Sequence, residues 1–193
     1  MNGLEAGLRD RLIDVGVELV TSGGTAAVSL REIARRAGVS HGAPRRYFPT
    51  HLELLSAIAR RGFAHLAAKL GEAAAGSAAD PRSRLAALSR AYLDFAASNR
   101  GMYELMFRHD LLESSRLGLR EVSLPLFRMV TTLVAGAQPQ AGAAPEVVAG
   151  ALWANLHGIA QLWGWGSLQL ATGLTDPGAL VQAALDAHLG PEH

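Results

Sequence analysis

Apolar residues recur at helical spacing along almost the whole chain, and this feature restricts the possible fold more than any other. Leu8, Leu12, Val15 and Leu19 form a first stripe, and similar three- and four-residue spacings continue towards the C-terminus. No segment shows the alternation of apolar and polar residues that is typical of a half-buried strand. Hydrophobic residues make up 49% of 193 residues, so the chain can bury a sizeable core. The sequence therefore predicts an all-α protein.

Capping signals locate several helix starts. Ser29 with Glu32, and Thr50 with Glu53, match the S/T-x-x-E capping box. Asp80-Pro81 and Asp176-Pro177 place a capping side chain before a first-turn proline. Beyond residue 80 we expect helices over about 80–98, 102–109, 115–135, 146–170 and 177–189, with a loop of Pro, Gly and Ala at 138–145.

Residues 29–48 have a sequence pattern that is typical of a helix-turn-helix. A short helix can end at Gly38, because glycine adopts the left-handed conformation that a tight stop requires. Val39 can fill the corner between the two helices, and the Ser40 hydroxyl can cap the second. Two helices that cross steeply over such a turn present the second helix to the DNA major groove. The alternative is an ordinary helical hairpin with arginines on its surface.

The charge distribution is compatible with DNA binding. Residues 1–61 carry nine Arg and six Asp or Glu, a net charge of +3, whereas residues 62–193 carry a net charge of −2. Arginine suits both phosphate oxygens and guanine edges. A chance fluctuation of a few charges explains the asymmetry equally well, so charge alone does not decide the function.

The run from Arg31 to Leu55 resembles the N-terminal domain of the tetracycline-repressor (TetR) family, whose pattern is roughly I-A-x-x-A-G-V-S-x-G-x-x-Y-x-H-F-x-x-K-x-x-L. The resemblance implies a three-helix DNA-binding domain over 1–50, a connecting helix over about 51–75, and a larger helical effector-binding and dimerisation domain over 76–193. It also implies a ligand-responsive repressor that binds a palindromic operator in double-stranded DNA as a homodimer.

The resemblance also indicates which residues face DNA. These are Ser29, Arg31, Ser40, His41, Gly42, Ala43, Arg45, Arg46, Tyr47, Thr50 and His51. Three of them depart from the family pattern, since Arg45 replaces Tyr, Tyr47 replaces His and His51 replaces the Lys that usually touches phosphate. A histidine there would be a weaker phosphate contact that strengthens when protonated. If Ser40 caps the second helix, Pro44 removes an early hydrogen bond and leaves that helix short or irregular.

The C-terminal part resembles a family type marked by Trp-x-x-x-His-Gly, here Trp153, His157 and Gly158. Bodies of this type commonly enclose a pocket for a small-molecule effector that changes DNA affinity. The candidate lining residues are Tyr92, Phe95, Tyr103, Met106, Phe107, Phe127, Trp153 and His157. The alternative is that these side chains are plain core. A charge-poor lining favours an apolar or neutral ligand.

One face of the helix that begins near Glu146 is predicted to be a dimer interface. Its members are small, polar or aromatic and lie opposite the apolar stripe of the same helix: Gly150, Ala154, Gly158, Gln161 and Trp165. The preceding segment, from Met129 to Pro145, also lacks charge, which suggests four helices across a twofold axis. The alternative is a large monomer core that covers both faces.

Other function classes are disfavoured. The chain has no Cys, no H-E-x-x-H motif and no glycine-rich phosphate loop, so we expect no enzymatic activity, no cofactor and no metal. The stretch between Glu146 and Asp176 has no formal charge and is long enough to span a bilayer, but Asn155, His157 and Gln161 lie near its centre. We expect no membrane association. Because the N-terminal segment is interrupted by charged residues, we expect no secretion signal and a cytoplasmic location.

Overall fold

A computed structural model of the chain describes residues 3–77, 80–108, 110–111, 118–137 and 143–191. All regular elements within these residues are helices, which confirms the predicted all-α class. The chain divides into two compact units, residues 1–65 with 99–123 and residues 66–98 with 124–193. The predicted functional boundaries at residues 50 and 76 follow a different criterion and stay predictions.

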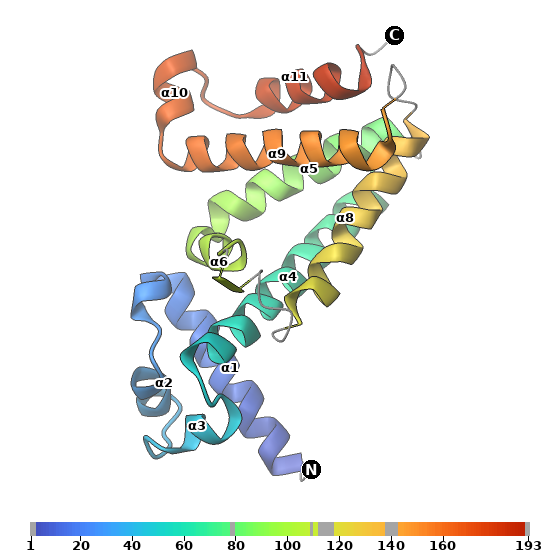
Figure 1. Cartoon of the computed structure of the whole chain (residues 1–193). Helices are drawn as coiled ribbons and strands as arrows, with labels where there is room; N and C mark the ends of the chain where they lie inside the picture. The colour runs from blue at the N-terminus through green and yellow to red at the C-terminus, as the bar shows by residue number, and fades with distance from the viewer. Residues whose placement is uncertain (1–2, 78–79, 109, 112–117, 138–142, 192–193) are drawn as a thin grey trace. The chain divides into compact units, whose positions relative to one another are not determined.

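The first unit contains the predicted helix-turn-helix (Figure 1). Its elements are α1 (Gly3–Gly23), the short η1 (Thr25–Ala27), α2 (Leu30–Arg36), α3 (Ala43–Tyr47), the first part of α4 (His51–Ala75), α6 (Arg100–Met106) and the start of α8 (Leu119–Gly136). Leu12, Ile33, Phe48 and Ile58 are almost completely buried and join α1, α2, α4 and the end of α3 in one core. The helices that the apolar stripes predicted therefore pack through those stripes.

Gly16 allows α1 to approach α4 closely. A Cβ atom at this position would lie 2.8 Å from Cγ1 of Ile58, closer than real Cβ contacts occur. Because Ile58 is completely buried, its side chain has little room to move away. The glycine is thus required by packing, although its place in the middle of a helix lowers the intrinsic helix propensity.

The second unit is built on α9 (Pro145–Gly164), against which α5 (Pro81–Ser98), α10 (Ser167–Thr172) and α11 (Gly178–Leu189) pack. Figure 1 shows α11 running beside α9. Leu85, Leu88, Leu152 and Leu185 are buried between these helices. Arg82 of α5 fixes the end of α11, since its guanidinium pairs with the carboxylate of Asp186 and donates to the Gly190 carbonyl at 2.7 Å.

Most of the predicted capping signals are confirmed. Thr50 and Glu53 form the complete reciprocal box, since the Glu53 amide donates to Thr50 Oγ1 at 3.2 Å and the Thr50 amide donates to the Glu53 carboxylate at 3.1 Å. Asp80 accepts from the Ser83 amide at 2.8 Å. Ser29 accepts from the Glu32 amide at 3.1 Å, but the Glu32 carboxylate turns to arginines instead of back to Ser29.

The predicted long helix from 146 to 170 is wrong in one respect, because it is broken after Gly164. Gly166 adopts a left-handed conformation with φ of 77°, and its amide donates to the Trp163 carbonyl at 3.0 Å, which ends α9 before α10 begins. The predicted helix from 115 starts at Leu119 in the structure, and residues 115–117 lie outside the described part. No helix in the described ranges combines the length and the apolar run needed to cross a membrane.

Candidate nucleic-acid interface

The turn that joins α2 to α3 is closed by a Schellman motif. Gly38 has φ of 67°, the left-handed region that favours glycine. The Val39 amide donates to the Ala34 carbonyl at 3.0 Å, and the Gly38 amide donates to the Arg35 carbonyl at 3.3 Å. These bonds satisfy carbonyls at the end of α2 and turn the chain sharply. The predicted stop at Gly38 is confirmed.

Pro44 determines where α3 begins, which corrects the expected capping role of Ser40. The N-cap is Gly42, and Pro44 occupies the first turn, where its missing amide hydrogen would have had no helical partner. Pro44 is buried, and its carbonyl accepts from the Phe48 amide at 2.9 Å. The proline therefore starts the helix later and does not distort it. The result is a recognition helix of five residues, Ala43–Tyr47.

Six of the nine arginines in residues 1–61 are held by groups of the protein itself. Those on α2 pair with Glu32, and those on α4 reach either acidic residues of α1 or the start of α8. The contacts are Arg9 over the Phe48 ring, Arg11 to the Ala37 carbonyl, Arg35 and Arg36 to Glu32, Arg60 to the Gly118 carbonyl, and Arg61 to Asp10 and Asp14. These contacts engage most of the arginine side chains that the sequence concentrates in this part of the chain.

Arg31, Arg45 and Arg46 are the exceptions. All three are exposed, and none makes a hydrogen bond or ion pair with any residue that the structure describes. Arg31 lies in the first turn of α2, whereas Arg45 and Arg46 lie on α3. Arginines that are exposed and unpaired beside the turn of a helix-turn-helix are free to contact phosphates or base edges.

The other predicted DNA-facing residues lie around these arginines. Ser40, His41 and Gly42 form the exposed turn before α3, Ala43 is its first residue, and Tyr47 is its last and is half-buried. Ser29 and Thr50 are exposed helix caps whose hydroxyl oxygens accept from backbone amides. The structure thus brings the predicted residues together within the first unit. Their contacts with DNA stay predictions.

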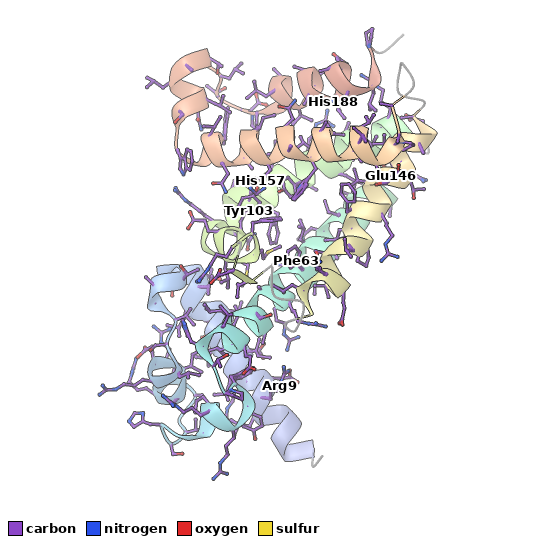
Figure 2. The ribbon with its side chains drawn as sticks, viewed as in Figure 1. Arg9, Phe63, Tyr103, Glu146, His157 and His188 are labelled. Atoms are coloured by element: carbon purple, nitrogen blue, oxygen red, sulfur yellow. The ribbon has the colours of Figure 1, made fainter. Side chains whose placement is uncertain are left out.

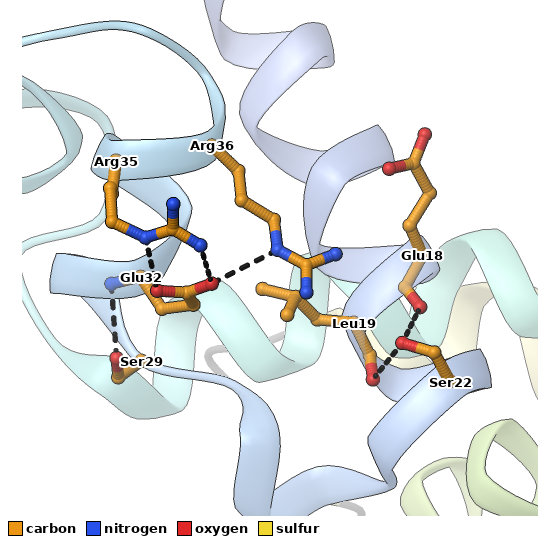
Figure 3. Close-up of polar contacts among 7 residues, drawn as sticks. All are labelled: Glu18, Leu19, Ser22, Ser29, Glu32, Arg35 and Arg36. Carbon is orange, nitrogen blue, oxygen red and sulfur yellow. Dashed lines mark hydrogen bonds and ion pairs between the residues drawn. The ribbon is translucent and has the colours of Figure 1, made fainter.

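Glu32 is the carboxylate that pairs with two exposed arginines of α2 (Figure 3). Arg35 donates to both carboxylate oxygens, at 2.8 and 2.6 Å, and Arg36 donates at 3.0 Å. These two guanidinium groups lower the pKa of Glu32 to about 2. The i,i+3 and i,i+4 spacings of these residues are a signal in the sequence from which the contacts could have been predicted.

We expect the pKa of the Glu32 carboxyl to be about 2, well below the ordinary value of a glutamate. Because the folded pKa is lowered, the ion cluster stabilises the fold above the unfolded pKa and loses this effect as the pH falls towards 2. Carboxyl carbon NMR of the folded protein measures the midpoint. Arg35→Ala should raise the pKa towards the ordinary value of a glutamate, whereas Arg61→Ala should not change it. An unperturbed midpoint in the wild type would contradict the arrangement.

A second group of predicted residues forms an aromatic and histidine cluster within the second unit, with His157 on the side of α9 that faces α5 (Figure 2). The Tyr92 hydroxyl lies 2.9 Å from His157 Nδ1 and accepts from Trp153 Nε1 at 3.3 Å. The Trp153 ring has edge contacts with Phe127 and His157. Burial lowers the pKa of His157, so the ring is neutral at pH 7. Its Nδ1 can then accept a hydrogen bond from the Tyr92 hydroxyl. Trp153 is still 42% exposed.

Tyr92→Phe should destabilise the protein by about 1–2 kcal/mol, because it removes the partner of His157 and the acceptor of Trp153 while keeping the ring. Urea unfolding of the purified protein measures this change. Tyr47→Phe is the matched control, since Tyr47 is half-buried and should cost less than about 0.5 kcal/mol. Equal stabilities for the two variants would contradict a structural role for the cluster.

The remaining pocket candidates have different surroundings. Phe95 is buried on α5 in the second unit. Tyr103, Met106 and Phe107 belong to the first unit, where the Phe107 ring has edge contacts with Phe63 and Tyr103. Their role in a ligand pocket stays a prediction.

The predicted dimer face of α9 is open in the described chain. Ala154 is exposed, Trp165 at the end of α9 is 63% exposed, and Gly150, Gly158 and Gln161 are partly exposed. A Cβ at Gly150 or Gly158 would meet no atom within 4 Å. Val147, 64% exposed, and Leu162 extend this face with apolar side chains. No residue between Glu146 and Asp176 carries a formal charge.

Two family models match the chain. A model of bacterial regulatory proteins of the tetR family matches residues 12–58, and a model of a tetracyclin repressor-like C-terminal domain matches residues 85–188. The first match contains the helix-turn-helix, and the second contains the aromatic cluster and most of α11. The Trp-x-x-x-His-Gly subtype stays a prediction.

Relatives point the same way. The chain is 40% identical over 91 residues to the HTH-type transcriptional regulator BetI of Rhizobium meliloti (46% of this chain, 43% of the relative), and 38% identical over 66 residues to the repressor KstR of Mycolicibacterium smegmatis (34% and 32%). These matches span less than half the length of the curated relatives. A solved structure of a protein of unknown function from Rhodococcus sp. RHA1 is 33% identical, with a TM-score of 0.76, over 93% of this chain and 92% of that one.

Proposed function

This chain belongs to the tetracycline-repressor (TetR) family of bacterial transcriptional regulators, and on that premise we propose that it is a ligand-responsive repressor that binds a palindromic operator as a homodimer. One observation carries the DNA-binding part. Of the nine arginines in residues 1–61, Arg31, Arg45 and Arg46 alone have no partner among the described residues, and all three are exposed at the helix-turn-helix. The relatives named above are regulators and not enzymes, in line with the expectation that this chain catalyses no reaction.

Selection from a random pool of double-stranded DNA at moderate salt tests this function. We expect a palindrome whose half-sites are about 34–36 Å apart, one DNA turn or a multiple of it, because a twofold dimer presents two equivalent recognition helices. Recovery of single half-sites would contradict the dimeric mode of binding. Recovery of no sequence above background would contradict specific binding by the free protein.

The open face of α9 supports the homodimer. Val147, Ala154, Gly158, Leu162 and Trp165 are spaced so that they share one side of a helix of 20 residues, about 30 Å long. Exposed apolar side chains at both ends and small residues in the middle allow a second copy of the same helix to approach closely. The absence of charged side chains along this face means that two copies can meet without like-charge repulsion.

The aromatic cluster of the second unit supports an effector site. Trp153, Phe127, Tyr92 and His157 combine apolar rings with a few polar atoms, a mixture that is common in small-molecule sites. His157 is neutral at pH 7 and the partners named here are uncharged, so we infer a neutral, largely apolar effector. Binding can change DNA affinity only by the difference in ligand affinity between the two states of the protein.

A screen for compounds that release the protein from its operator tests the effector proposal. We expect neutral aromatic compounds to release DNA and to change the fluorescence of the wild type more than that of Trp153→Phe. Trp163 and Trp165 remain in the variant and serve as internal controls. Release by charged metabolites alone would contradict a site at this cluster.

A further inference from the structure

His51, the first residue of α4, makes a hydrogen bond that no local pattern in the sequence indicates. Its Nε2 lies 3.0 Å from the backbone carbonyl oxygen of Val28, which is 23 residues away in the chain. A carbonyl oxygen can only accept, so the imidazole must carry a proton on Nε2 and donate it. In the neutral ring the other nitrogen, Nδ1, is then an acceptor. It therefore cannot donate a hydrogen bond to a phosphate oxygen.

Both ends of this bond are firmly held. Val28 is buried and directly precedes Ser29, the N-cap of α2. The backbone before His51 is fixed by the reciprocal capping box, in which Thr50 and Glu53 exchange two hydrogen bonds. The Glu53 carboxylate also occupies the Thr50 amide, which is therefore not available to an anion. The bond thus joins the first turn of α4 to Val28, the residue before the N-cap of α2.

We propose that His51 is a positioning residue for DNA binding, which holds the start of α2 against the start of α4, and that it is not a phosphate ligand. The inference rests on the proposed function of the helix-turn-helix. The orientation of α2 matters because Arg31 lies in its first turn and because the turn at Gly38 carries that orientation to α3. When the orientation of α2 is fixed before binding, the arginines are already in place, and the cost of ordering them on binding to DNA is lower.

Two variants at His51 separate positioning from phosphate contact. Gln carries an amide nitrogen close to the place of Nε2 and can keep the bond to Val28, whereas Ala cannot. We expect His51→Ala to lower operator affinity about tenfold with an unchanged salt dependence, and His51→Gln to stay within about threefold of the wild type. Kd values are measured by fluorescence anisotropy with the selected operator at several salt concentrations.

Several outcomes would overturn the proposal. Unchanged affinity in His51→Ala would remove any positioning role. A plot of log K against log salt that is less steep than that of the wild type by about 0.9 in both variants would identify a phosphate contact instead. If His51→Ala does not fold, the wild type and His51→Gln are compared between pH 5.5 and 8.5, and both proteins keep His41, the other histidine among the predicted DNA-facing residues. Parallel profiles support positioning, and stronger binding at low pH in the wild type alone overturns it.

A measurement without variants tests the bond itself. Nitrogen NMR of the imidazole should show the tautomer protonated at Nε2 in the free protein, and the tautomer protonated at Nδ1 would overturn the proposal. The two levels of failure are distinguishable. A wild type that binds no operator contradicts the proposed function, whereas a wild type that binds normally while His51→Ala does so equally well contradicts only the role of His51.

Discussion

Replacing Arg45 and Arg46 together by Ala is expected to lower operator affinity by about a hundredfold, the largest effect of any change on α3, since each base or phosphate contact is worth about 1–3 kcal/mol. Both side chains are exposed and make no described ion pair, so their removal should leave the fold intact. Anisotropy titrations measure the affinity, and thermal unfolding verifies the fold. The single variants then assign the contacts. A weaker dependence of log K on log salt in a single variant indicates that the lost arginine contacts a phosphate. A relaxed sequence preference indicates that it contacts a base.

Arg61→Ala is the matched control for these variants. It removes one positive charge from an exposed position, as each single variant at Arg45 or Arg46 does, but Arg61 is paired with Asp10 and Asp14. We expect less than a threefold change in affinity, of the size that weak long-range electrostatics gives. An equal loss in the control and in each single variant at Arg45 or Arg46 would mean that net charge alone drives binding. That result would contradict an interface centred on α3.

Ala154→Glu is expected to convert the proposed homodimer into a monomer. At a twofold interface the change introduces two carboxylates that face each other without partners, and burying each costs several kcal/mol. Sedimentation velocity at micromolar concentration should show a single monomer species. Operator affinity should fall by at least about a hundredfold, since the second half-site is no longer bound intramolecularly.

Ala68→Glu provides the comparison for this change. Ala68 is also an exposed alanine within a long helix, α4, and the substitution adds the same charge to each chain. We expect the dimer and its operator affinity to be retained. A dimeric Ala154→Glu protein would show that the face of α9 around Ala154 is not the interface. Loss of the dimer in both variants would point to a general effect of added charge.

Local signals in the sequence predicted the helices and many of their ends. Ser29, the Thr50 and Glu53 pair, and Asp80 all cap helices as expected, because a cap depends only on residues within one turn. Gly38 ends α2 for the same reason. Competing local signals were harder to weigh. Ser40 looked like a cap for α3, but Pro44 moved the start of the helix to Ala43, because proline belongs in a first turn.

The break after α9 was missed for a different reason. Residues 146–170 have apolar spacing throughout, and a glycine within a helical pattern is compatible either with a continuous helix or with a stop. In the structure Gly166 takes the left-handed conformation and separates α9 from α10. Periodicity indicates which residues favour a helix, but it does not determine where the chain has to turn in order to pack.

The sequence by itself determined the all-helical fold, the position of the helix-turn-helix and the group of residues around it, because these depend on short spacings and local propensities. Only the tertiary structure decided which polar side chains bond to other groups of the protein and which are left available to DNA. Arg11 reaches the Ala37 carbonyl, Arg60 reaches Gly118, and His51 reaches Val28 across 23 residues. Such partners are distant in the chain and are brought together by packing, so no local pattern distinguishes a paired side chain from Arg45 or Arg46, which are left exposed to solvent.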